Sequence, residues 1–248
     1  MTWIISIAFA ACGLLVVGIA LHKVFRSLDP SKISGYRPCA GGWWEAKLNN
    51  CSSGLLKVPQ QPVNTYTNVA YVAVGFFLLF KINTLPSYVL SLTLLYLCVG
   101  SALYHAMSTR WAGSLDVSGM YALFSAMTAY IICKYIGLDN SLVALIMFMV
   151  AVLCGYLLRY RYRGNMSLKI GIFLVLTYLF TILSMLQNNR SLVSGYLIAS
   201  FAMFALAYLA WILDKARNFP LKRFGHGLWH VLTAAAISVL FYGSYLSE

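Results

Sequence analysis

The stretch SLVALIMFMVAVLCGYLLR, residues 141–159, decides what kind of fold this chain adopts. Its only charged residue is the last one, Arg159. A helix of about 20 mostly apolar residues spans the hydrocarbon core of a bilayer, because each residue rises about 1.5 Å and the helix pairs its own backbone polar groups. The stretch therefore predicts a transmembrane helix.

Segments of the same kind recur along the chain. Hydrophobic residues make up 61% of the sequence and charged residues only 10%, against about 25% charged in a soluble domain. Eight segments are long and apolar enough to span a bilayer: 3–21, 65–82, 87–107, 114–136, 141–159, 168–187, 192–213 and 226–245. We therefore predict an all-α, polytopic membrane helix bundle, in which a seven-helix core is joined by one extra N-terminal transmembrane helix. The expected division is an anchor helix over 1–26, an extramembrane loop over 27–64 and the core over 65–248.

The basic residues predict the orientation of this integral, multi-pass protein in a cell or inner membrane. Of the 18 lysines and arginines, all but Lys81, Lys134 and Arg190 fall in segments that alternating helices place on one side. The positive-inside rule makes that side cytoplasmic. No basic patch alternates with aromatic residues on an amphipathic element, so nucleic acid is not expected as a partner despite the net charge of +12. The expected partners are the bilayer and a membrane lipid, and no pattern indicates an oligomeric state.

Five polar residues stand out near the ends of three of these segments. Asp116 is the only acid expected inside a span or at its edge, where an ionisable residue costs about 2.5–3.5 kcal/mol. Ser101 and His105 are four residues apart, as are His226 and His230, so each pair lies on one face of its helix. Alternation brings all three helix ends to the cytoplasmic side of the membrane. The spacing therefore predicts one shared site.

Three neutral imidazoles from two helices are typical of a catalytic zinc site, which keeps a fourth position for water. Zinc lowers the pKa of such a water to about 7. We therefore expect His105, His226 and His230 to bind Zn²⁺. Asp116 would accept a proton from the water or orient a ligand histidine, and Ser101 would hold the water or donate to a developing oxyanion.

Simpler interpretations of the same residues remain open. Two histidines four residues apart are more often an interhelical hydrogen-bonding pair, and a lone Ser101 is typical of helix packing in lipid. Asp116 could cap the fourth helix together with Ser114. Ser101, His105 and Asp116 also have the composition of a hydrolase triad, but a triad would leave the two C-terminal histidines unexplained.

The combined motif resembles the alkaline ceramidase family. SALYHAMSTRWAGSLD, residues 101–116, and HGLWH, residues 226–230, carry the resemblance. The family belongs to a superfamily of seven-helix membrane metal hydrolases that also includes adiponectin-receptor-like proteins. The stretch CSSGLLKVPQQPVNTYTNVAYVAVGF, residues 51–76, is similar to the family's entry into the first core helix, through Asn64, Thr65, Thr67 and Asn68.

The resemblance implies a zinc-dependent hydrolase of carbon–nitrogen bonds that cleaves a ceramide-like lipid to a sphingoid base and a fatty acid. It makes His105, His226 and His230 the zinc ligands, with Ser101 and Asp116 as polar partners of the metal-bound water. Similar ceramidases carry an acid-rich segment that can bind calcium. The corresponding stretch here, WWEAKLNNCSSG over 43–54, has a single acid, so calcium is not expected.

Two other functions fit the same residues. One is a phospholipid or other ester hydrolase with the same zinc site. The other is a receptor-like or structural protein in which a non-catalytic zinc ties helices together. A transporter is disfavoured, because the sequence has no inverted repeat and no matched pair of broken helices.

Overall fold

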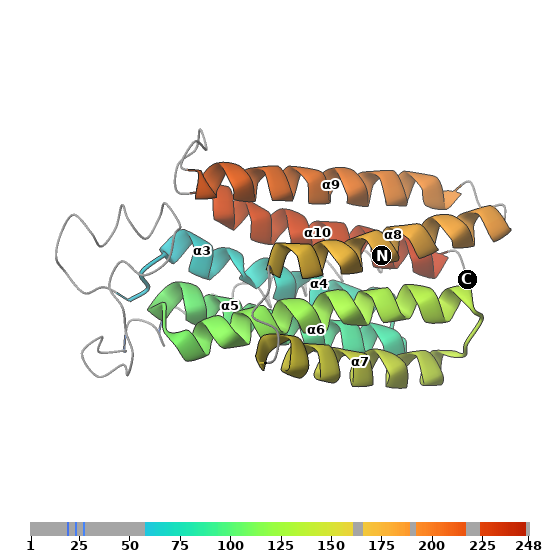
Figure 1. Cartoon of the computed structure of the whole chain (residues 1–248), viewed down its shortest axis with the longest axis horizontal. Helices are drawn as coiled ribbons and strands as arrows, with labels where there is room; N and C mark the ends of the chain where they lie inside the picture. The colour runs from blue at the N-terminus through green and yellow to red at the C-terminus, as the bar shows by residue number, and fades with distance from the viewer. Residues whose placement is uncertain are drawn as a thin grey trace.

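The computed structural model describes residues 58–160, 166–188, 192–216 and 224–246, with the single residues 19, 23 and 27. These ranges contain helices and no strand (Figure 1). The helices are α3 (Pro62–Thr67), α4 (Val69–Lys81), α5 (Leu85–Met107), α6 (Arg110–Tyr135), α7 (Asn140–Tyr160), α8 (Met166–Asn188), α9 (Leu192–Lys215) and α10 (Gly225–Leu246). Because α3 and α4 together form one span, the described residues contain seven helices long and apolar enough to cross a membrane. The predicted all-α polytopic bundle is confirmed.

The first helix of the core begins earlier than its apolar run. The sequence predicts a core from residue 65, whereas α3 begins at Pro62. Proline suits the first turn of a helix, because it lacks an N–H that would be unpaired there in any case. The predicted anchor helix over 1–26 and the loop up to residue 57 lie outside the described residues, apart from the three single positions.

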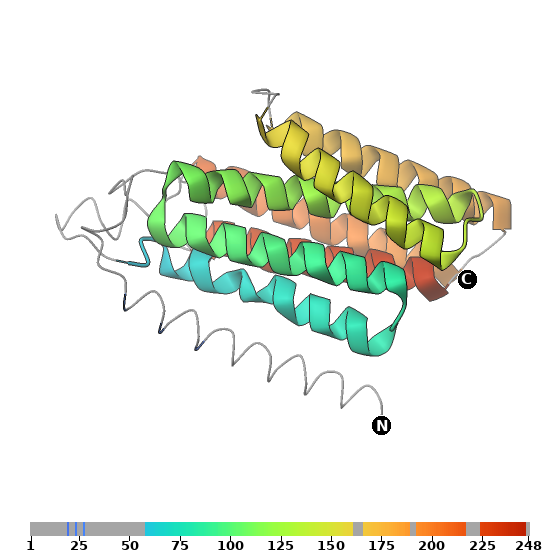
Figure 2. The ribbon, with the colours of Figure 1, turned by 90° about the horizontal axis from the view of Figure 1, so that it is seen from below.

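α6 lies in the middle of the bundle, packed against α5, α7 and α8 (Figure 2). In the 18-residue apolar stretch of α6, 78% is buried inside the bundle, whereas in the corresponding stretch of α8 only 17% is buried. α7, α8 and α9 accordingly expose large apolar side chains, among them Leu153, Val175 and Phe201. In a bilayer such side chains contact acyl chains, so these three helices form much of the lipid-facing surface.

Serine hydroxyls join neighbouring helices inside the bundle. Three of them donate hydrogen bonds of 2.9 Å to backbone carbonyl oxygens of a neighbouring helix: Ser91 to Gly75, Ser118 to Gly155 and Ser200 to Ala236. Small hydroxyl residues allow helix backbones to approach closely in a membrane, where apolar burial between helices supplies little driving force.

A close approach of α5 to α6 depends on Gly100. A Cβ atom at this position would lie 2.8 Å from the carbonyl carbon of Leu115 in α6. We expect Gly100→Ala to lower the free energy of unfolding by about 1–3 kcal/mol, because the two backbones would have to separate. A lower midpoint of thermal unfolding in detergent measures this loss.

Gly195→Ala is the matched control for that prediction. Gly195 is an exposed residue of α9, and a Cβ atom there would have no neighbour within 4 Å. Its replacement should leave stability unchanged or raise it by up to about 1 kcal/mol, because alanine favours a helix. Equal losses in the two variants would contradict the close-packing role of Gly100.

Candidate metal centre

Three histidines meet at the end of the bundle where α3 lies (Figure 1). His105 comes from the last turn of α5, and His226 and His230 come from the first turns of α10. All three are buried, and one ring nitrogen from each lies within 4.8 Å of the other two. The structure therefore brings together the three residues predicted as ligands, and they could hold a metal ion.

A glycine in α10 lets α3 pack close to these histidines. A Cβ atom at Gly227 would lie 3.0 Å from Cγ1 of Val63 and 3.1 Å from Cγ2 of Thr67. The backbone of the segment before α3 is also fixed to α5, because the Gln61 N–H donates to the carbonyl oxygen of His105 at 3.1 Å. The start of the core thus covers the histidine cluster from one side.

The partner of His105 determines which of its ring nitrogens faces the cluster. Its Nδ1 lies 2.8 Å from Oε1 of Gln61. That oxygen also accepts a hydrogen bond of 2.8 Å from Nδ2 of Asn64. Because an amide oxygen only accepts, Nδ1 of His105 carries the proton. In the neutral ring, Nε2 therefore presents a lone pair to the other histidines.

The same reasoning applies to His230. Its Nδ1 lies 3.0 Å from Oγ1 of Thr67. The Thr67 hydroxyl donates its own proton to the carbonyl oxygen of Val63 at 2.8 Å, so its oxygen accepts from His230. Nε2 of His230 is therefore left with a lone pair. Metal-binding histidines are commonly oriented by a hydrogen bond of this kind at the other ring nitrogen.

The spacing of the ring nitrogens fits a small cation. Nε2 of His105 and Nε2 of His226 are 3.0 Å apart. Zinc holds imidazole nitrogens at about 2.0–2.1 Å, so two nitrogens of a tetrahedral site lie about 3.3 Å apart. Lone pairs this close repel each other unless a proton or a cation lies between them. The three imidazoles and the spacing of this pair are therefore compatible with a bound metal ion.

Thr67→Val tests the role of the hydrogen bond to His230. Valine has nearly the same shape as threonine but lacks the hydroxyl oxygen that accepts the hydrogen bond from Nδ1–H of His230. We expect zinc affinity to fall about 10–100-fold, as is typical when the hydrogen-bond partner of a ligand is lost. Competition of the purified protein with a zinc-chelating dye measures the change. Thr67→Ser keeps the hydroxyl and should bind zinc as the native chain does, and equal affinities in the two variants would contradict the proposed orientation.

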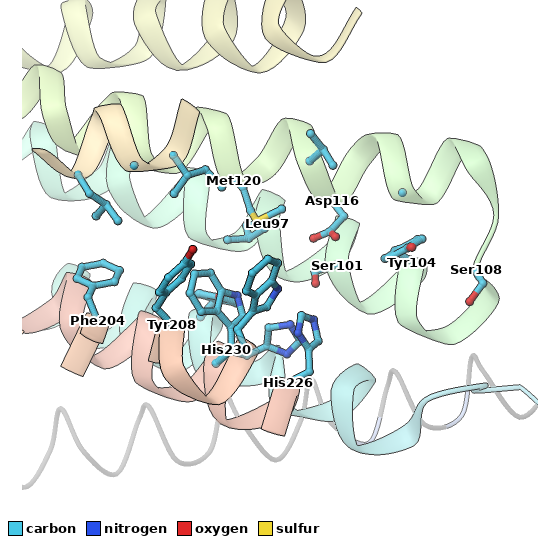
Figure 3. Close-up of a pocket in the computed structure, with 18 of the residues that line it drawn as sticks. Leu97, Ser101, Tyr104, Ser108, Asp116, Met120, Phe204, Tyr208, His226 and His230 are labelled. Atoms are coloured by element: carbon cyan, nitrogen blue, oxygen red, sulfur yellow. The ribbon is translucent and has the colours of Figure 1, made fainter. Parts of the chain in front are cut away.

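Asp116 and Ser101 lie opposite the two histidines of α10 (Figure 3). Both are buried and line the same cavity, with the Ser101 hydroxyl beside the Asp116 carboxylate. Asp116 does not cap its helix. α6 begins at Arg110 and not at residue 114, and its cap is Thr109, whose Oγ1 accepts from the Ala112 N–H at 3.3 Å. The interpretation of Asp116 as a helix cap is therefore wrong, and its catalytic role stays a prediction.

A cavity of about 710 Å³ joins these groups. It is lined by Ser101, Asp116, His226 and His230. Figure 3 shows it extending from Ser108 at one end, past the imidazoles, to Phe204 at the other. The lining is mostly apolar, and Leu97 of α5, Leu174 of α8 and Phe204 of α9 are among its residues. The arrangement offers a polar reaction site next to a space for an apolar chain.

Several residues of this site are not among those predicted from the sequence. Gln61 and Thr67 are the hydrogen-bond partners of His105 and His230, and of the two only Thr67 belongs to the predicted set, as part of the family-like entry. Tyr71 and Tyr104 also line the cavity. The prediction that Asp116 is the only acid of a span is also wrong: α9 continues to Lys215, which places the buried Asp214 in its last turn. The one sequence feature that could point to Gln61 as a site residue is the pair of glutamines, Gln60 and Gln61, directly before Pro62.

The fold and the site together define a class of protein. The chain is a polytopic helical membrane protein with a buried three-histidine cluster that could hold a metal ion, open to a partly apolar cavity. No protein-family model matches the sequence, and no curated protein matches it significantly.

Proposed function

We propose that this protein is a zinc-dependent lipid amidase of the membrane, similar to alkaline ceramidases. The observation that carries the proposal is the pairing of two features. Ring nitrogens of His105, His226 and His230 converge within 4.8 Å, and the cavity beside them has a mostly apolar lining. A metal that only ties helices together would need no such cavity.

Zinc, when bound by the three imidazoles, supplies Lewis acidity and makes a coordinated water a nucleophile near neutral pH. The side chains of the protein then divide the remaining work. The Asp116 carboxylate accepts a proton from the attacking water while the oxygen of that water bonds to the amide carbon. It returns that proton to the nitrogen as the carbon–nitrogen bond breaks, which yields a fatty acid and an amine.

Ser101 supports both steps from the same wall of the cavity. Its hydroxyl lies beside the Asp116 carboxylate and faces the imidazoles (Figure 3). In the substrate complex this hydroxyl either holds the carboxylate in place or donates to the developing oxyanion. The Tyr104 hydroxyl, on the same helix and in the same cavity, is a second donor for that oxygen.

The substrate is a membrane lipid, which enters sideways from the bilayer. The apolar walls of the cavity come partly from α8 and α9, through Leu174 and Phe204. These helices also present much of the lipid-facing surface of the bundle. An acyl chain can pass between the bilayer and this end of the cavity without exposure to water, while the amide carbonyl reaches Ser101 and the imidazoles.

Metal analysis and a lipid panel test the proposal. The purified full chain should contain about one zinc per chain and should hydrolyse ceramides faster than matched ester lipids. A chelator should abolish turnover, and added zinc should restore it. Turnover that persists in the zinc-free protein would overturn the mechanism. Faster cleavage of esters than of amides would favour the phospholipid or ester hydrolase. Bound zinc without any turnover would favour the receptor-like or structural protein.

A further inference from the structure

Three consecutive residues line the end of the cavity that is opposite Phe204. Ser108, Thr109 and Arg110, here called the mouth cluster, make the turn from α5 to α6, and all three line the cavity. Figure 3 shows Ser108 at the opposite end from Phe204. The proposed amide hydrolysis uses none of these three side chains.

The Ser108 hydroxyl is buried without a partner. The residue is 5% exposed, and within the described part of the chain its Oγ forms no hydrogen bond. Its backbone adopts the left-handed conformation, with φ of 50°, where α5 ends. A buried hydroxyl without a partner destabilises the folded chain. A ligand that accepts a hydrogen bond at this end of the cavity would remove this destabilisation.

Arg110, two residues after Ser108, adds a positive charge to the lining of the cavity. Its side chain is exposed, and no carboxylate of the described residues forms an ion pair with it. It is also the only lysine or arginine among the described residues that line the cavity. Arg110 is the first residue of α6. The unpaired backbone N–H groups and the positive end of the helix dipole therefore lie at the same end of α6 as this side chain. The mouth cluster therefore combines a guanidinium, hydroxyl donors and a helix N-terminus.

We propose that the mouth cluster binds a phosphate in the head group of the lipid substrate. The substrate would then be an N-acyl lipid with a phosphorylated head, an inference that rests on the proposed amidase function. A guanidinium fork and hydroxyl donors match phosphate oxygens. Ser101 lies about two turns, or about 10 Å, before the end of α5, and Ser108 is the residue that caps this end. This distance leaves space between the reacting carbonyl and the phosphate for the few atoms that link them in such a lipid.

Binding measurements test the proposal without turnover. The zinc-loaded full chain carrying Asp116→Asn is titrated in detergent with a short-chain N-acyl sphingosine and with the same lipid phosphorylated at its head. Fluorescence of Trp211 and Trp229, which line the cavity, reports binding. We expect the phosphorylated lipid to bind about tenfold more tightly, the effect of one charge-assisted hydrogen-bonded contact.

Variants assign that preference to the mouth cluster. Arg110→Gln should weaken binding of the phosphorylated lipid about tenfold and that of the neutral lipid less than twofold. Ser108→Gly, which suits the left-handed backbone, should weaken binding of the phosphorylated lipid about threefold and leave binding of the neutral lipid unchanged. Lys134→Gln, at the opposite end of α6, is the matched control and should change neither affinity.

Four results would overturn the phosphate site. They are failure of the phosphorylated lipid to bind, equal affinity for the two lipids, a preference that survives Arg110→Gln, and equal losses for both lipids in that variant. Inorganic phosphate that competes as well as the phosphorylated lipid would assign the cluster to a free anion and also overturn the proposal. Absence of turnover by the native chain is a separate result: it would defeat the amidase, whereas the binding data decide the phosphate site.

Discussion

His226→Ala is expected to lose bound zinc, to unfold at a lower temperature and to have no measurable amidase turnover. His226 supplies one of three converging ring nitrogens, and its Nε2 is 3.0 Å from that of His105. Two imidazoles alone bind a zinc ion much more weakly than three. A ligand present at about 1,000 times its Kd stabilises the folded state by about 4 kcal/mol. The variant should forfeit a stabilisation of that order in zinc-containing buffer.

Metal content and thermal unfolding, each measured with and without chelator, check this expectation. The native chain should contain about one zinc and should unfold at a lower temperature after chelation. The variant should contain almost none and should not respond to the chelator. A variant that retains the zinc of the native chain would show that His226 is not a ligand.

The transmembrane helices could be predicted from the sequence because the membrane imposes a simple requirement. Each span must place about 20 consecutive apolar residues in the bilayer, so the long apolar runs of α7, α8 and α9 predict these helices directly. Helix ends were harder to predict. α6 begins at Arg110, four residues before its apolar run, because the Thr109 side chain caps it. Capping depends on local hydrogen bonds and not on hydropathy.

The histidine cluster was predictable for a related reason. Ionisable residues are so rare in this chain that five polar positions at three helix ends stood out against an apolar background. Their hydrogen-bond partners had no comparable signal. Gln61 reaches His105 across 44 residues, and Thr67 reaches His230 across 163. Such contacts depend on how the helices pack, and hydroxyl and amide residues are also common at ordinary helix contacts.

The two walls of the site have different tasks. On one side, α3 and the segment before it orient His105 and His230 through Gln61 and Thr67. On the other, α5 and α6 carry Ser101 and Asp116 into the cavity. Removal of a group from the first wall should therefore change metal affinity. Removal of a group from the second should change chemistry with the metal still bound.

Asp116→Asn is expected to lower turnover by about 10²–10⁴-fold while zinc content and the unfolding midpoint stay close to native. Asparagine has nearly the shape of aspartate and keeps an oxygen that can accept from Ser101. It cannot accept the proton of the attacking water, and a positioned acid–base group contributes about this factor to a rate. Steady-state hydrolysis of a ceramide, together with metal analysis and unfolding of the same preparation, measures the effect.

Ser101→Ala and His226→Ala place this result in context. Because Ser101 acts beside the carboxylate, its replacement should lower turnover less than Asp116→Asn and should also leave zinc in place. His226→Ala should lose zinc, stability and turnover together. A structural zinc that only joins α5 to α10 predicts a different pattern, in which His226→Ala destabilises the chain and Asp116→Asn changes nothing measurable. Full turnover in Asp116→Asn would thus remove the acid–base role from the only acid among the described residues that line the cavity.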